Sequence, residues 1–201
     1  MLPAEELVRF MRHARPRFVH AAPDKLEALG DLIAEGAIEG LIASPGDFPA
    51  DDLREEGTAA CRALDRNPSD TAAVLFTGGT TGIPKGVLLS HENITVSSHN
   101  VAYSERSTEK DRALCFLPFN HVFGQMHIMN ATIMSAGCLE LLPSFDMDRG
   151  LSLFAAGRVT KFFSVPTVYV RLLGVPDLKN RLGRLRYCFS AAASMATEIV
   201  R

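Results

Sequence analysis

The sequence predicts an α/β protein with largely parallel sheets and flanking helices. Two observations support this fold class. Apolar runs of strand length alternate along the chain with stretches whose apolar residues have helical spacing. The connections between the strands are long enough to hold a helix, which is typical of parallel strands. We therefore expect strand–helix–strand units along most of the chain.

The chain up to residue 76 holds three predicted strands and the helices between them. Pro3 suits the first position of a helix, and Glu5 and Glu6 fall in the first turn, where acidic side chains suit the helix dipole. Pro16 ends this helix. The elements expected next are a strand at 18–22, a helix at about 24–35, the strand IEGLIAS, the helix DDLREEGTAACRALDR, the loop NPSD and the buried strand TAAVLF.

The remainder of the chain continues the alternation. Ser90 is placed to cap a helix that begins HENITVSSHN, and Pro166 takes the first position of the helix PTVYVRLLG. The other expected strands are GVLLS, RALCFLPF, CLELLP, TKFFSVP and LRYCFS, and the other helices are VFGQMHIMNATIMSA, a segment near 147–156 and SMATEIVR. The last helix has barely begun where the sequence stops, so we expect a chain that is cut rather than finished.

Composition narrows the class of protein. Of 201 residues, 47% are hydrophobic and 22% are charged, and the net charge of -2 favours neither nucleic acid nor a charged membrane surface as a partner. The four cysteines form no CxxC pair, which argues against a zinc site or disulfide framework and fits a reducing compartment. The start of the chain is charged, unlike a secretory signal, and MHIMNATIMSAGCLELL is too short and too polar to span a bilayer. We expect a soluble cytoplasmic protein with no metal site on this chain.

One loop concentrates the chemistry. The segment FTGGTTGIPKGV, residues 76–87, follows the strand TAAVLF and holds four glycines, three threonines and a lysine. Such a loop can present several backbone N–H groups to one phosphate, with Thr77, Thr80 and Thr81 as hydroxyl donors and Lys85 as a full charge. The spacing is not that of a Walker A loop, because Lys85 lies between Pro84 and Gly86. A surface loop with tight turns is the alternative, and the whole string favours phosphate.

The same loop resembles the signature loop of the adenylate-forming enzymes, which include acyl- and aryl-CoA ligases, peptide-synthetase adenylation domains and firefly-type luciferases. The resemblance continues through LSHENI and through two further blocks in the expected order. LPFNHVFGQ resembles the family's Pro-aromatic-His-aromatic-Gly segment, and VPTVYVRLL fits the stretch after it. CFSAAASM resembles the Ser-Gly-Ala-Ala-Pro-Leu segment, with Ala191 in place of glycine and Ser194 in place of proline.

The resemblance implies ATP-dependent activation of a carboxylic acid to an acyl-adenylate and then transfer of the acyl group to the thiol of coenzyme A, with Mg²⁺ as a cofactor. It implies catalytic roles for Lys85 and His121, with Phe123 and Gly124 shaping the acyl pocket beside His121. The nucleotide would be bound by Thr77, Gly78, Gly79, Thr80, Thr81, Gly82, Lys85, Ala191, Ala192 and Ala193. A core histidine and a small-residue packing site are the alternatives for His121 and for the alanines.

The substrate class is a fatty or aromatic acid. Amino-acid-activating members carry an aspartate near the position of Asn120 and His121 to pair with the substrate ammonium group, and FNHVFGQ has none. A buried ammonium group without a partner would be costly. The other histidines match no metal-ligand spacing, and we expect them to be surface or helix residues: His13, His20, His91, His99 and His127.

The resemblance also implies that parts of the catalytic unit are absent. Residues 1–201 correspond to part of the large N-terminal, AMP-binding domain, without its upstream strands and without the C-terminal domain. The segments expected to bind ribose and magnesium and to complete the thiol transfer follow the alanine block in the family. Two hypotheses remain: part of an acyl-CoA ligase, truncated or completed by a second chain and inactive alone, or a non-enzymatic remnant that binds phosphate weakly or serves as an interaction module.

Overall fold

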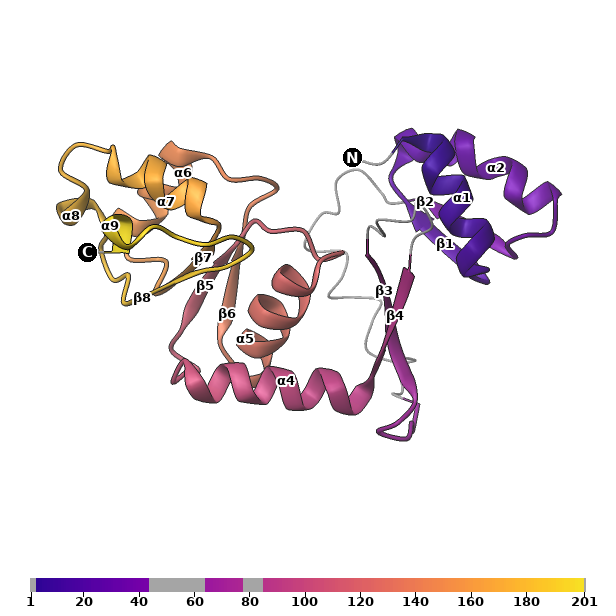
Figure 1. Ribbon diagram of the computed structural model, residues 1–201, viewed down its shortest axis with the longest axis horizontal. Coiled ribbons are helices and arrows are strands. Elements are labelled where there is room, and N and C mark those ends of the chain that lie inside the picture. The colour runs from indigo at the N-terminus through magenta and orange to yellow at the C-terminus, as the bar shows by residue number, and fades with distance from the viewer. Residues whose placement is uncertain (1–2, 44–63, 78–84, 201) are drawn as a thin grey trace, which may run out of the picture. The chain divides into compact units, whose positions relative to one another are not determined.

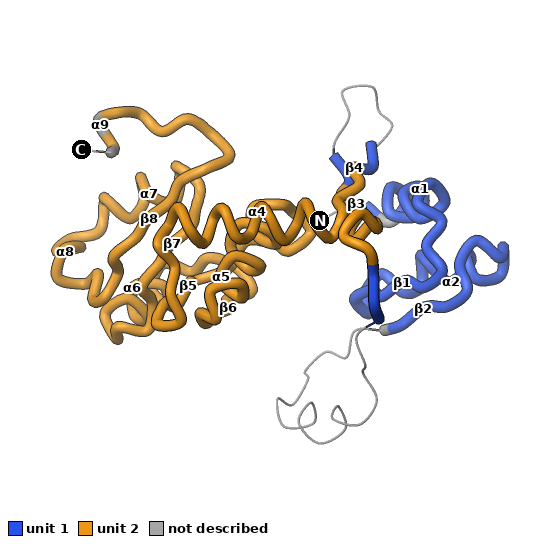
Figure 2. Tube along the Cα trace, turned by 90° about the horizontal axis from the view of Figure 1, so that it is seen from below, with its two compact units in different colours: residues 1–66, 76–86 blue, residues 67–75, 87–201 orange. Residues whose placement is uncertain are grey.

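The computed structural model of the chain describes residues 3–43, 64–77 and 85–200. They fall into two compact units, which are coloured separately in Figure 2. One comprises residues 1–66 and 76–86, and the other comprises residues 67–75 and 87–201.

The first unit packs two helices against two parallel strands. The helix α1 (Ala4–Ala14) begins after Pro3 with Glu5 and Glu6 in its first turn, as predicted. It ends one residue before Arg15 turns into the left-handed region with a φ of 47°. The chain therefore leaves the helix just before Pro16, which could not have continued it.

The strands β1 (Phe18–Ala21) and β2 (Gly40–Ala43) pair in parallel, with the short helix η1 (Pro23–Lys25) and the helix α2 (Leu26–Ala34) between them. This strand–helix–strand unit is the predicted one. Its core consists of Val19, Leu29, Leu32 and Ile38. The helix expected over DDLREEGTAACRALDR falls almost entirely outside the described residues.

The strands β3 (Thr71–Thr77) and β4 (Lys85–Ser90) pair with each other. The prediction of a strand over TAAVLF is confirmed, but the prediction that it is buried is wrong, because Val74 is 45% exposed. An apolar run is buried on both faces only where other layers cover both faces. Within the described residues, β3 has β4 as its one partner strand.

The second unit contains the helix α4 (His91–Ser104), which Ser90 caps as predicted. The Ser90 hydroxyl accepts a hydrogen bond from the backbone N–H of Asn93, and the Asn93 side chain accepts one from the backbone N–H of Ser90, both at 3.1 Å. This reciprocal pair satisfies N–H groups that have no partner inside the helix.

A four-stranded parallel sheet forms the centre of this unit, in the order β6-β5-β7-β8. The prediction of a largely parallel sheet is confirmed, and Figure 1 shows helices on both of its faces. The strands are β5 (Arg112–Cys115), β6 (Cys138–Leu141), β7 (Lys161–Ser164) and β8 (Tyr187–Ser190).

Successive side chains of the central strands point to opposite faces, and each face has its own core. Leu114 and Phe162 belong to a core that includes Phe154 and is covered by α6 (Met147–Ala155), α7 (Pro166–Leu173) and α8 (Leu178–Arg181). Ala113, Cys115 and Phe163 belong to the other core, with Phe123 and Ile128. Burial on both faces explains why the strands of the parallel sheet are almost continuously apolar.

The second core is covered by a helix that departs from the prediction. Residues 122–136 were expected to form one ordinary helix, but residues Phe123–Asn130 form a π-helix, η2, which continues into the short α-helix α5 (Ala131–Met134). π-Helical turns are rare and occur frequently at functional sites. The last helix, α9 (Thr197–Val200), follows β8 as expected.

Candidate active site

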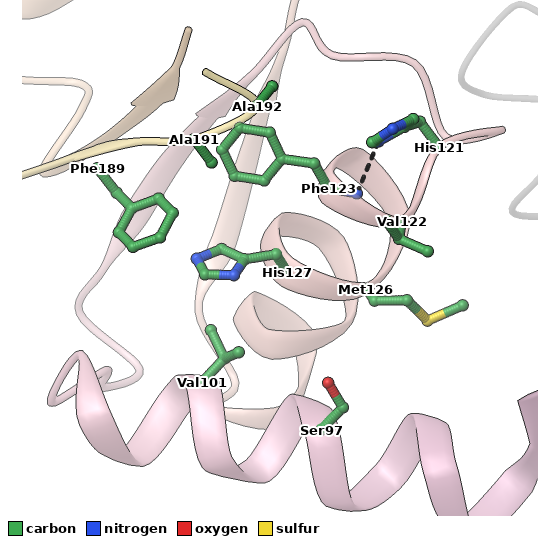
Figure 3. A pocket seen from close by; sticks show the side chains of 10 residues that line it. All are labelled: Ser97, Val101, His121, Val122, Phe123, Met126, His127, Phe189, Ala191 and Ala192. Atoms are coloured by element: carbon green, nitrogen blue, oxygen red, sulfur yellow. Dashed lines mark hydrogen bonds between the residues drawn. The ribbon is translucent and has the colours of Figure 1, made fainter. Parts of the chain in front are cut away.

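A pocket of about 400 Å³ lies at the carboxyl end of the parallel sheet, between α4, η2 and the end of β8 (Figure 3). Open α/β sheets bind ligands at this edge. Helix α4 contributes Ser97 and Val101 to the wall. The segment from the end of the β5 loop into η2 contributes His121, Val122, Phe123, Met126 and His127, and the chain at the end of β8 contributes Phe189, Ala191 and Ala192.

His121 lies at the start of η2 with a defined tautomer. Its Nδ1 accepts a hydrogen bond of 3.1 Å from the backbone N–H of Phe123, drawn as a dashed line in Figure 3. An amide N–H can only donate, so the hydrogen of the neutral ring must be on Nε2. The side chain is exposed, so this N–H is available to a ligand. The role of His121 at an acyl pocket stays a prediction, and the structure places this residue in the wall of the pocket.

Phe123 and Gly124 contribute differently from each other. The ring of Phe123 lines the pocket and contacts Phe189 edge-on, with ring centroids 6.0 Å apart. Gly124 is buried and does not line the pocket. A Cβ atom there would lie 2.4 Å from the carbonyl oxygen of Pro118, so only glycine lets η2 start this close to the preceding loop. Its contribution is to hold the segment that carries His121.

The alanine segment closes the pocket at the end of β8. Ala191 and Ala192 line it, whereas Ala193 does not. The backbone N–H of Ala191 donates to the carbonyl of Ser164 at 3.2 Å, which continues the β7–β8 pairing by one residue. Ala192 then turns with a φ of 72°, a conformation that is strained for a residue with a side chain. Ala191 stands where the similar family segment has a glycine. The backbone continues the sheet pairing at Ala191 and makes a left-handed turn at the next residue, Ala192.

The predicted phosphate loop is described only at its two ends. Thr77 is the last residue of β3, and Lys85 is the exposed first residue of β4. The Thr77 hydroxyl donates to the carbonyl oxygen of Lys85 at 3.5 Å, so the two ends lie side by side. The predicted ligands between them lie outside the described residues: Gly78, Gly79, Thr80, Thr81 and Gly82.

His127 is a pocket residue that the sequence-based analysis missed. It was expected to be a surface or helix residue, and it does lie in the helix η2, but its side chain is only 22% exposed and forms part of the pocket wall. Its Nε2 lies 2.8 Å from a carboxylate oxygen of Glu105. Nothing in the local sequence could have indicated this, because the two residues are 22 positions apart and meet only through the packing of η2 on α4.

Neither a metal centre nor a membrane span is found in residues 3–43, 64–77 and 85–200. This part of the chain holds no group of three His, Cys, Asp or Glu residues arranged to bind a metal ion. It also holds no helix that is both long and apolar enough to cross a bilayer. Three cysteines in it are free thiols, and burial raises the pKa of Cys115 to about 11, so this thiol stays protonated and unreactive near neutral pH.

The sequence profile of one family of enzymes, described as AMP-binding enzyme, matches residues 1–201. The chain belongs to the AMP-binding enzyme family. Among curated relatives, a long-chain-fatty-acid–CoA ligase of Bacillus subtilis is 33% identical over 151 residues, which are 73% of this chain and 27% of that protein. Sulfoacetate–CoA ligase of Cupriavidus necator is 28% identical over 195 residues, which are 96% of this chain and 38% of that protein.

Solved structures of other proteins show the same architecture. The structure of apo MatB from Rhodopseudomonas palustris matches with a TM-score of 0.87 and 32% identity, over 98% of this chain and 39% of that one. The N-terminal domain of FACL13 from Mycobacterium tuberculosis matches in fold, with a TM-score of 0.81 and 24% identity, over 99% of this chain and 50% of that one. The fold is therefore that of the N-terminal domain of adenylate-forming enzymes. The chain spans 24% to 38% of the length of the curated relatives that it matches.

Proposed function

We propose that this chain is the acid-binding and phosphate-binding part of an acyl-CoA ligase. In the proposed reaction, a carboxylate oxygen of the acid attacks the α-phosphorus of ATP, and pyrophosphate leaves. The thiol of coenzyme A then attacks the acyl carbon of the acyl-adenylate, and AMP leaves. Coenzyme A is preferred over another thiol because the curated relatives are CoA ligases.

The observation that carries the proposal is the free Nε2–H of His121 at an apolar pocket. This N–H can donate a hydrogen bond to one carboxylate oxygen and leave the other oxygen to react. Orientation is needed because the reactants repel each other. A carboxylate about 4 Å from one phosphate charge is destabilised by roughly 4 kcal/mol at an effective dielectric constant near 20. Phosphoryl-transfer sites act mainly by positioning and by neutralising such charges.

The neutralising groups are proposed from the segment between Thr77 and Lys85. The glycine amides and threonine hydroxyls would bind the β- and γ-phosphates, and Lys85 would contribute a positive charge. Mg²⁺ bound to ATP would reduce the phosphate charge that the carboxylate meets. No described residue is assigned as a ligand of that ion.

The pocket favours a fatty or aromatic acid over an amino acid. Most of the described side chains that line it are apolar, and none of these described residues is an aspartate or a glutamate. An amino-acid substrate would leave its ammonium group without a carboxylate partner.

We propose the complete reaction for a protein that also contains the remaining segments of the family, or for this chain together with a complementing chain. The fragment assignment of residues 1–201 and the cytoplasmic location belong to the same proposal. The greater length of the curated relatives supports the fragment assignment. The free thiols in the described part of the chain support the cytoplasmic location.

The test is ATP-dependent formation of acyl-adenylate by the 201-residue chain, with a panel of fatty and aromatic acids. It is run with and without the C-terminal half of a related ligase. We expect activity only when that half is added and loss of that activity in His121→Ala. If the folded chain forms no acyl-adenylate either with or without the added C-terminal half, the result would favour a non-enzymatic remnant instead.

Binding of nucleotides tests the phosphate loop separately. Lys85→Ala should weaken binding of ATP far more than binding of AMP, because Lys85 is assigned to the β- and γ-phosphates. Lys179→Ala on α8 is the matched control and should change neither. Equal weakening of ATP and AMP in Lys85→Ala would contradict the assignment.

A further inference from the structure

Three ionisable side chains from three elements meet behind the pocket. Glu105 is the C-cap residue of α4, His127 belongs to η2, and Lys161 begins β7. One carboxylate oxygen of Glu105 lies 2.8 Å from Nε2 of His127, and the other lies 3.1 Å from Nζ of Lys161. The side chains of Glu105 and Lys161 are only 4% and 3% exposed. The network is therefore part of the interior, and of its three members His127 is the one that lines the pocket.

The ammonium group of Lys161 has a partner for each of its three N–H donors. It donates to the Glu105 carboxylate, to the Ser107 hydroxyl at 2.5 Å and to the Glu105 carbonyl at 3.5 Å, and it lies 5.2 Å from the ring centroid of Tyr187. The positive charge of Lys161 compensates the negative charge of Glu105. The carboxylate is consequently ionised and held in place, and an ionised carboxylate can only accept hydrogen bonds.

Glu105 therefore determines which nitrogen of His127 carries the hydrogen. Nε2 must donate to the carboxylate, so Nδ1 of the neutral ring carries a lone pair. Nδ1 has no hydrogen-bond partner among the described residues, and it is not one of the fully buried polar atoms that lack a partner. The ring that carries this nitrogen lines the pocket.

The orientation of the ring is held by aromatic packing. His127 stacks on Phe189 with centroids 4.5 Å apart and contacts the rings of Phe123 and Phe163 edge-on at 5.4 and 5.6 Å. Figure 3 shows the ring between Phe189 and Val101. The pocket thus holds two histidines of opposite character, His121 with a free N–H donor and His127 with a free acceptor.

We propose that His127 selects acids that carry a hydroxyl group away from the carboxylate. The proposal rests on the proposed function, since it takes the pocket as the site of the acid. In the bound complex, Nε2–H of His121 donates to the carboxylate, and Nδ1 of His127 accepts from the hydroxyl. An acid without that hydroxyl displaces water from Nδ1 and leaves it unpaired, and a site built to pair with a hydroxyl rejects such an acid.

The first experiment observes both rings in the 201-residue chain labelled with nitrogen-15 histidine, at about pH 8, where a histidine is usually neutral. The ligands are para-hydroxyphenylpropanoate and phenylpropanoate, which differ by one hydroxyl. We expect both acids to shift the Nε2–H resonance of His121 and only the hydroxylated acid to shift Nδ1 of His127. Equal effects of both acids at His127 would overturn this proposal and leave the proposed function standing. No effect of either acid at His121 would overturn both.

The second experiment compares affinities. We expect the hydroxylated acid to bind about tenfold more tightly than phenylpropanoate, and this preference should vanish in His127→Leu. His99→Ala is the matched control, because His99 is exposed on α4, stacks on Tyr103 and does not line the pocket. A preference that survives His127→Leu would overturn the proposal. So would tighter binding of the para-carboxy analogue by the wild-type chain, because that result requires a donor at Nδ1.

Glu105→Gln tests whether Glu105 positions His127. A glutamine can either donate to or accept from Nε2, so the tautomer of His127 is no longer determined. We expect the nitrogen-15 spectrum to show both tautomers and the preference for the hydroxylated acid to fall severalfold. An unchanged tautomer and an unchanged preference would show that Glu105 has only a structural role.

Discussion

Two buried carboxylates in the second unit can be compared directly. Glu105 and Asp111 lie six positions apart in the sequence, on either side of the turn between α4 and β5, and both side chains are 4% exposed. Each is paired with a cation from the sheet, Lys161 at the start of β7 for Glu105 and Arg186 just before β8 for Asp111. The two pairs join the same region of the fold, and they differ in what else each carboxylate contacts.

The contacts of Asp111 are all structural. It accepts hydrogen bonds from Arg186 at 2.6 and 3.0 Å, from the Thr160 hydroxyl at 2.8 Å and from the backbone N–H of Thr108 at 2.8 Å. Glu105, by contrast, contacts His127, a residue of the pocket wall whose second nitrogen has no hydrogen-bond partner among the described residues. The difference teaches that burial and ion pairing alone do not indicate function. A buried network is linked to a site when one of its members keeps an unpaired atom facing a cavity.

The largest effect that we expect is a loss of stability when the cation of the Glu105 pair is removed. Lys161→Met leaves the Glu105 carboxylate buried without a cation, and the free energy of unfolding should fall by about 3–5 kcal/mol. Urea unfolding monitored by tyrosine fluorescence is suitable, because the chain has no tryptophan and its three tyrosines, Tyr103, Tyr169 and Tyr187, all lie in the second unit.

The control for this variant is the double substitution Lys161→Met with Glu105→Leu. Replacing a whole buried ion pair by apolar residues is often nearly neutral, so the double variant should recover most of the lost stability. A single variant that unfolds within about 1 kcal/mol of the wild type would mean that water or another cation reaches Glu105.

Asp111→Asn should have a smaller effect, a loss of about 2 kcal/mol, because the partner guanidinium is already 45% exposed and can be solvated in the variant. Its acid preference should equal that of the wild type, since none of the Asp111 contacts reaches the pocket. The same urea titration and the same pair of acids measure both quantities. A changed acid preference would show that the two networks are coupled.

The pH dependence of stability tests whether the ionised carboxylate of Asp111 stabilises the fold. Burial alone would raise the pKa of Asp111, but hydrogen bonds from Arg186, Thr108 and Thr160 and the charge of Arg186 outweigh it and hold the pKa below its ordinary value of 3.8. A carboxyl group with a lowered pKa in the folded state stabilises the protein above its ordinary value, and this stability is lost as the pH falls through the lowered pKa.

The stability gap between wild type and Asp111→Asn should therefore be constant near neutrality. It should shrink from about pH 5 downward, as Asp111 becomes protonated. Unfolding titrations at several pH values measure the gap. A gap that widens on acidification would contradict the direction of the pKa shift.

The smallest effect concerns a single hydroxyl. Thr160→Val removes the donor to Asp111 and the acceptor for the backbone N–H of Arg112 at 2.9 Å, and it should reduce stability by about 1 kcal/mol. Thr167→Val, at an exposed position on α7, is the matched control and should change stability by less than about 0.5 kcal/mol. Equal effects of the two substitutions would show that the hydrogen bond from Thr160 to Asp111 does not contribute to stability.

Several features of the fold were predictable because they depend on neighbours in the sequence. The cap at Ser90, the proline at the start of α7 and the helix after Pro3 each follow from residues within one helical turn. The parallel sheet followed from the alternation of apolar runs and helical stretches. The exposure of β3 did not follow, because an apolar strand is buried only if other layers cover it.

The candidate site also contains residues that the sequence indicated and residues that only the structure revealed. His121 could be assigned from the segment LPFNHVFGQ, in which the partner of its ring is a backbone amide two positions away. The sequence by itself determined the fold class and the family and made this histidine a candidate, because local spacing and consecutive motifs carry that information. Glu105 is 22 positions from His127 and 56 positions from Lys161 in the sequence. Only the tertiary structure decided that they meet, because packing of α4 and η2 on the sheet brings them together, and neither spacing nor composition records that contact.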